Sequence, residues 1–166
     1  MSKTMKVMLV GALLLALSAG MATAQIMAQD VITCSKGGPE RCNGSSGNDR
    51  IPSSSRSDDI YASAGHDLVD ARGGRDLVLG GADGDDPNFG GLEGGPGNDT
   101  VKGQDGDDTV KGEASSDEDR LFGDAGSDFA DGRDGDRRDV LDCGPRRDVF
   151  ARDNGDEVKK NRERPF

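Results

Sequence analysis

The stretch Gly94-Gly95-Pro96-Gly97-Asn98-Asp99-Thr100-Val101 is followed, after Lys102, by Gly103-Gln104-Asp105-Gly106-Asp107-Asp108-Thr109-Val110. Both segments read G-x-x-G-[ND]-D-T-V, and the second begins nine residues after the first. Each segment joins a glycine-rich turn to a short strand. A nine-residue period held in register over adjacent copies is typical of a parallel β-solenoid.

The aspartate of this motif recurs along the chain from Gly44 onward. Aligning the copies on G-x-D places it at Asp49, Asp59, Asp67, Asp76, Asp86, Asp99, Asp108, Asp119, Asp128, Asp139, Asp148 and Asp156. Two residues after each aspartate the chain has Ile51, Tyr61, Val69, Val78, Asn88, Val101, Val110, Leu121, Ala130, Leu141, Phe150 and Val158. All of these except Asn88 are apolar or aromatic. An apolar residue at one fixed phase of the repeat predicts the filling of a narrow solenoid interior.

Glycine stands two residues before the aspartate in seven copies: Gly47, Gly65, Gly74, Gly84, Gly97, Gly106 and Gly126. A tight turn needs a positive φ or a close approach of main chain to an ion, and glycine permits both. The other five copies have Ser57, Asp117, Arg137, Arg146 and Asn154 at this position. The last three copies therefore keep the period but lose the turn chemistry.

These repeats resemble the hemolysin-type (RTX-like) calcium-binding nonapeptide repeat family. The resemblance covers Gly44 to Asp128, and it continues only as a faded period from Arg137 to Val158. It implies an all-β, right-handed parallel β-roll of about twelve repeats, with calcium bound between turns by aspartates and backbone carbonyls. The implied ligands are the aspartates that keep their glycine, together with those glycines: Asp49, Asp67, Asp76, Asp86, Asp99, Asp108 and Asp128. Asp59 and Asp119 are further candidates that lack the glycine.

The chemistry of calcium agrees with these residue types. Calcium takes about six to eight oxygen ligands, which carboxylates and exposed backbone carbonyls supply. With two repeats per turn, Asp49 would face Asp67, and adjacent strands lie about 4.8 Å apart. Two bare carboxylates about 5 Å apart repel by roughly 3 kcal/mol at an effective dielectric of about 20. We therefore expect the chain to be largely unfolded without calcium and to fold on binding it.

The first 24 residues predict a secretory signal peptide, with cleavage after Ala24. Lys3 and Lys6 precede the apolar run Val7–Leu17, and Ala22-Thr23-Ala24 supplies a small-residue cleavage site. We divide the rest into a leader or cap over 25–43, calcium-binding repeats over 44–136, and degenerate arginine-rich repeats with a C-terminal tail over 137–166. Export to an oxidising compartment favours a Cys34–Cys42 disulfide, and it leaves Cys143 either buried or paired between chains.

The composition separates function classes. A net charge of −11 argues against nucleic acid and anionic membrane surfaces as partners, and it favours cations. No set of residues indicates an enzyme, so the expected function is a secreted, non-enzymatic calcium-binding protein. The alternative is a structural or adhesive cell-surface or matrix protein that uses the roll as a stiff scaffold. Near the C-terminus, Arg137, Arg138, Arg146 and Arg147 either neutralise the aspartates without metal or are simply solvated.

Overall fold

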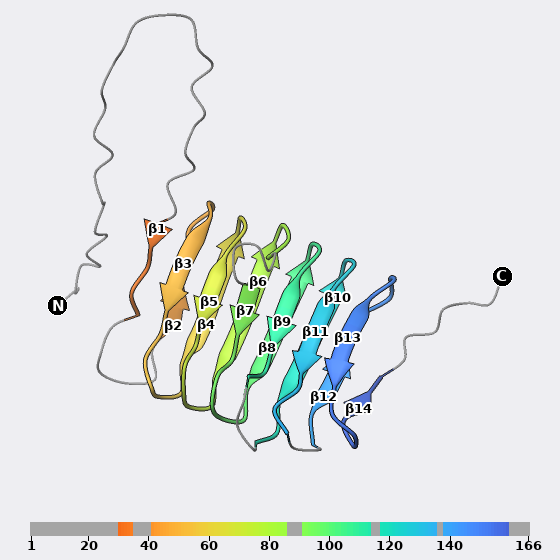
Figure 1. The fold of residues 1–166 in the computed structure, drawn as a ribbon. Helices are drawn as coiled ribbons and strands as arrows, with labels where there is room; N and C mark the ends of the chain where they lie inside the picture. The colour runs from red at the N-terminus through yellow and green to blue at the C-terminus, as the bar shows by residue number, and fades with distance from the viewer. Residues whose placement is uncertain (1–29, 35–40, 86–90, 114–116, 136–137, 160–166) are drawn as a thin grey trace, which may run out of the picture.

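The computed structural model describes residues 30–34, 41–85, 91–113, 117–135 and 138–159. Within these ranges every regular element is a β-strand, and all strand pairs are parallel. Figure 1 shows the strands stacked along one axis, with β1 at one end and β13 and β14 at the other. The all-β parallel solenoid predicted from the sequence is confirmed.

Odd-numbered strands form one seven-stranded sheet, called the odd sheet below. Their order in space follows their order in the chain. The strands are β1 (Asp30–Val31), β3 (Asp49–Pro52), β5 (Leu68–Asp70), β7 (Gly91–Glu93), β9 (Thr109–Lys111), β11 (Phe129–Gly132) and β13 (Val149–Arg152).

Even-numbered strands form the second seven-stranded sheet, called the even sheet. They are β2 (Arg41–Asn43), β4 (Asp59–Ala64), β6 (Leu77–Ala82), β8 (Thr100–Asp105), β10 (Arg120–Ala125), β12 (Val140–Asp142) and β14 (Glu157–Val158). Because consecutive strands alternate between the sheets, each turn of the solenoid contains one strand of each. The leader contributes β1 and β2, and the degenerate repeats continue both sheets to β14.

The core consists of one column of apolar side chains along each sheet. In the odd sheet, register aligns Ile51, Val69, Leu92, Val110 and Ala130, and each is 0% exposed. In the even sheet, Cys42, Ile60, Val78, Val101, Leu121 and Leu141 are aligned and buried in the same way. With about 4.8 Å between strands, such columns remove side chains from water along the whole axis.

At two pairs of adjacent aspartates, the buried aspartate of the structure is not the one chosen by the sequence alignment. In Asp58-Asp59 the buried residue is Asp58, and Asp59 is an exposed strand residue. The core residue of that repeat is therefore Ile60, whereas Tyr61 is half-buried on the outer face. Asp85, which directly precedes the aligned Asp86, is buried. Asp86 and Asn88 lie outside the described residues.

A disulfide links two residues of the N-terminal leader. Cys34 and Cys42 are bonded, with their Cα atoms 5.4 Å apart. Strand β1 pairs with β3 and β2 pairs with β4, so the leader supplies the first turn of the solenoid. Cys143 is a free, buried cysteine in the described part of the chain. The predicted signal peptide lies outside the described residues.

Candidate metal centre

One buried aspartate stands at the beginning of almost every strand, and these residues form two files along the axis. From Asp49 to Asp139 their exposed fractions lie between 0 and 3%. The file beside the odd sheet contains Asp49, Asp67, Asp85, Asp108, Asp128 and Asp148. The file beside the even sheet contains Asp58, Asp76, Asp99, Asp119, Asp139 and Asp156. We call the two files together the aspartate ladder and each aspartate a rung.

Hydrogen bonds connect each rung to the rung one turn later. The backbone N–H of Asp67, for example, donates to Oδ1 of Asp85 at 2.7 Å, and that of Asp76 donates to Oδ1 of Asp99 at the same distance. The pattern continues without a break from Asp49 to Asp128, with donor–acceptor distances of 2.7 to 3.0 Å. The carboxylates are therefore stacked, as expected for Asp49 over Asp67.

The second oxygen of seven consecutive rungs has no hydrogen-bond partner. These buried Oδ2 atoms belong to Asp67, Asp76, Asp85, Asp99, Asp108, Asp119 and Asp128. A buried polar atom without a partner costs free energy, and more so when the group is ionised. These seven oxygens therefore need either a proton or a cation.

Small residues line the space beside the carboxylates. Two residues after each core side chain stands a small residue such as Ala62, Ala71, Gly80, Gly103 or Gly123. A Cβ placed on Gly103 would lie 2.2 Å from Oδ2 of Asp108, and one placed on Gly123 would lie 2.4 Å from Oδ2 of Asp128. These glycines keep side-chain atoms away from the unpartnered oxygens. The alternation of apolar and small residues was the sequence signal for this column, which the alignment on G-x-D missed.

The glycines two residues before the aspartates serve the stacking of the turns. Gly65, Gly74, Gly97 and Gly106 have φ between 116° and 143°. A Cβ on Gly97 would lie 1.5 Å from the carbonyl oxygen of Gly74, which belongs to the preceding turn. Successive turns thus approach at backbone contact, where only glycine fits. Gly84 differs from the alignment, because it directly precedes its rung Asp85.

Burial raises the pKa of the ladder carboxyls. Desolvation is the largest cause, and the charges of neighbouring aspartates act in the same direction. The pKa is raised to about 8 for Asp85 and Asp119, to about 7 for Asp67, Asp99 and Asp128, and to about 6 for Asp76 and Asp108. The backbone N–H of the preceding rung opposes the shift. Without a cation, several rungs therefore hold protons near neutral pH.

The donor set fits calcium only if backbone oxygens take part. Within the described ranges, no group of three or more His, Cys, Asp or Glu side chains could hold a metal ion. One carboxylate per repeat is too few for the roughly six to eight oxygens that calcium takes. The turns offer the remaining donors as carbonyl oxygens, and the unpartnered Oδ2 atoms supply the charge. The residues present thus fit a hard cation bound between turns.

The C-terminal arginines that the structure describes, Arg138, Arg146 and Arg147, lie at the surface. Arg138 forms an ion pair with Glu118 at 3.2 Å, and both side chains are about half exposed. Arg146 and Arg147 are exposed, and Arg137 lies outside the described residues. Exposed ion pairs contribute about 0 to 1 kcal/mol, so these arginines are surface residues in energetic terms.

Adding a methyl group beside a carboxylate tests the small-residue column. We expect Gly103→Ala to lower the thermal unfolding midpoint in calcium and to weaken calcium binding, because the new Cβ would overlap Oδ2 of Asp108. Overpacking of this kind costs about 1–3 kcal/mol. The matched control is Gly73→Ala, whose Cβ would meet its nearest atom at 3.5 Å. Equal midpoints for the two variants would contradict the assignment of this column.

Comparison with known families agrees with this geometry. A family model described as the RTX calcium-binding nonapeptide repeat (4 copies) matches residues 53–86, 92–118 and 113–136. No curated protein and no solved structure matches the chain. In the described ranges, no helix is long and apolar enough to cross a membrane.

Proposed function

We propose that this chain, whose residues 53–86 and 92–136 match RTX calcium-binding nonapeptide repeats, is a secreted calcium-binding protein that folds on binding the ion. The observation that carries the proposal is the series of seven buried carboxylate oxygens without a partner, Asp67 to Asp128. The function is non-enzymatic, in keeping with repeats that serve as calcium-binding structural units.

Each of the seven rungs contributes one charged oxygen toward a cation. Oδ1 is already used by the N–H of the preceding rung, so Oδ2 is the ligand atom. The backbone carbonyls of the glycine turns provide neutral oxygens, since the turns stack at backbone contact. Calcium supplies positive charge that offsets the desolvation and mutual repulsion of the carboxylates.

Two features support export. The predicted signal peptide directs the chain out of the cytoplasm. The Cys34–Cys42 disulfide is of a kind that persists in oxidising compartments. Extracellular calcium modules typically bind with dissociation constants of about 10⁻⁴–10⁻³ M, and we place this protein in that range.

Calorimetric titration of residues 25–166 with calcium tests the proposal. We expect saturable binding of several ions at millimolar calcium, and we expect Asp99→Asn to reduce the number of ions bound, because Asp99 is 0% exposed and its Oδ2 has no partner. The control is Asp105→Asn, because Asp105 is exposed at the end of β8. Absence of binding, or equal loss in the two variants, would contradict the proposal.

A further inference from the structure

The first rung of each file differs from the seven rungs that follow, because donors of its own loop already hydrogen-bond its Oδ2. Oδ2 of Asp49 accepts from the backbone N–H of Ser45 at 2.6 Å, and Oδ1 accepts from Ser45 Oγ at 3.2 Å. Oδ2 of Asp58 accepts from Ser53 Oγ at 2.5 Å, Ser54 Oγ at 2.8 Å and Ser54 N–H at 3.2 Å. Serine donors thus surround the oxygen that has no partner in the later rungs.

The backbone distinguishes the same two rungs. Four residues before Asp67, Asp76, Asp108 and Asp128 stand Ser63, Arg72, Gln104 and Asp124, all with φ between 68° and 91°. Ser45 and Ser54 occupy this position before Asp49 and Asp58, and neither has a positive φ. In these two loops the backbone N–H at this position donates to Oδ2 of the aspartate, whereas Oδ2 has no hydrogen-bond partner in the rungs from Asp67 to Asp128. The serine side chains and the backbone φ angles therefore both distinguish Asp49 and Asp58 from the later rungs.

We propose that the ladder has two kinds of rung: Asp49 and Asp58 are closed by serine and take no calcium, whereas the rungs from Asp67 to Asp128 take it. The inference rests on the proposed function and deepens it by assigning which repeats hold ions. Three donors occupy the lone pairs of Oδ2 of Asp58, the oxygen that has no partner in the rungs from Asp67 to Asp128. Their partial positive charges also oppose a cation beside this oxygen.

A consequence is that the N-terminal turns stay folded without calcium. Charge-assisted hydrogen bonds from its own loop stabilise the charge of Asp58. The first rung of the file beside the even sheet therefore needs no metal ion. The disulfide closes a loop within the leader that pairs with β3 and β4, which restricts the unfolded chain. The N–H groups of Asp49 and Asp58 then present donors to Asp67 and Asp76, at 2.8 and 2.7 Å. The closed turns are a template on which the calcium turns assemble.

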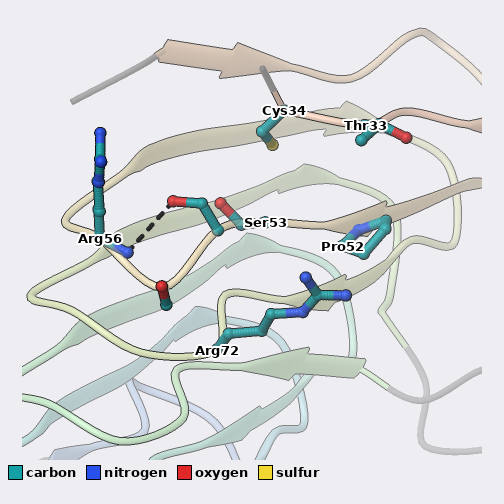
Figure 2. Close-up of a pocket in the computed structure, with 8 residues that line it drawn as sticks. Thr33, Cys34, Pro52, Ser53, Arg56 and Arg72 are labelled. Atoms are coloured by element: carbon teal, nitrogen blue, oxygen red, sulfur yellow. Dashed lines mark hydrogen bonds between the residues drawn. The ribbon is translucent and has the colours of Figure 1, made fainter. Parts of the chain in front are cut away.

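The serine loop lies against the leader. Figure 2 shows Thr33 and Cys34 of the leader on one side of a hollow of about 410 Å³, with Ser53, Arg56 and Arg72 on the other sides. The loop is also braced internally, because the N–H of Arg56 donates to Ser54 Oγ at 3.2 Å, drawn as the dashed line. In the middle of the solenoid, each calcium-binding turn follows another calcium-binding turn. At this end, the leader and the serine donors take the place of that preceding turn.

Hydrogen exchange of the mature chain in a calcium chelator tests the template. We expect the amides of β3 and β4 to exchange at least tenfold more slowly than those of β8 and β9. Ser53→Ala with Ser54→Ala should remove this protection and give the Asp58 rung an alanine where the next repeat has Ala62. The matched control is Ser63→Ala, an exposed serine one repeat later, which should leave the protection unchanged. Equal exchange in β3 and β8 would overturn the inference.

Calcium stoichiometry provides the second measurement. Asp58→Asn should leave the number of bound ions unchanged, whereas Asp76→Asn, one turn later in the same file, should lower it. If Asp58→Asn removes ions as Asp76→Asn does, the inference is wrong while the proposed function stands. If the wild-type chain binds no calcium, the proposed function fails, and the assignment of ions to rungs fails with it.

Discussion

Calcium added to the metal-free chain at pH 7.5 is expected to convert a largely unfolded chain into the parallel solenoid. Seven consecutive rungs hold an unpartnered buried Oδ2, and the interior contributes only one large apolar side chain per strand. Burial of one such side chain contributes about 1.5–3 kcal/mol, whereas an unpaired buried charge costs more than that. Far-UV circular dichroism, recorded with chelator and then with millimolar calcium, should show a large gain of β-structure.

Magnesium is the matched control for this experiment. It demands near-octahedral geometry and keeps several waters, so a site built from backbone carbonyls and one carboxylate suits it poorly. We expect magnesium at the same concentration to recover little of the signal. Identical spectra with chelator and with calcium would refute calcium-coupled folding.

Acidification of the calcium-free chain is expected to increase its stability between pH 8 and pH 5. The folded-state pKa of Asp85 and Asp119 is raised to about 8, and that of Asp67, Asp99 and Asp128 to about 7, chiefly by burial. An unfolded aspartate has a pKa of about 3.9, so the folded state binds more protons across this window. The stability that this contributes is fully present below the unfolded pKa and is lost as pH rises through about 6 to 8.

Far-UV circular dichroism in chelator at pH 5 and at pH 8 measures this effect, with more β-structure expected at pH 5. In saturating calcium the trend should reverse, because protons and calcium compete for the same oxygens and calcium binding strengthens as pH rises. A calcium-free chain that is more stable at pH 8 than at pH 5 would show that the ladder carboxyls are not buried as described.

The fold was predictable because the nine-residue phase carries both the turn glycines and the core residues. The choice within the doublets Asp58-Asp59 and Asp85-Asp86 was not. For the second doublet, the glycine rule favours Asp86 through Gly84, whereas the stacking of turns selects Asp85, whose N–H donates to Asp108. For the first doublet, Ile60 rather than Tyr61 enters the core, and the apolar character of both residues left that choice open in the sequence.

The distinction between closed and open rungs also lay outside sequence reasoning. Ser53 and Ser54 look like ordinary loop serines, and their role depends on a local hydrogen-bond geometry and a φ angle. Asp119 shows the converse. It lacks the turn glycine, yet its Oδ2 is buried and without a partner like that of Asp99. The turn glycine of the nine-residue motif therefore does not separate the two kinds of rung.

The alternation of strands between the two sheets constrains how such a chain can change its length. Each strand pairs only with strands two places earlier and later in the chain. Loss or gain of a single repeat would transfer every later strand to the opposite sheet and place each remaining core residue over a different neighbour. Loss or gain of two repeats preserves every later partnership. Duplication by pairs is therefore the route that leaves the rest of the molecule intact.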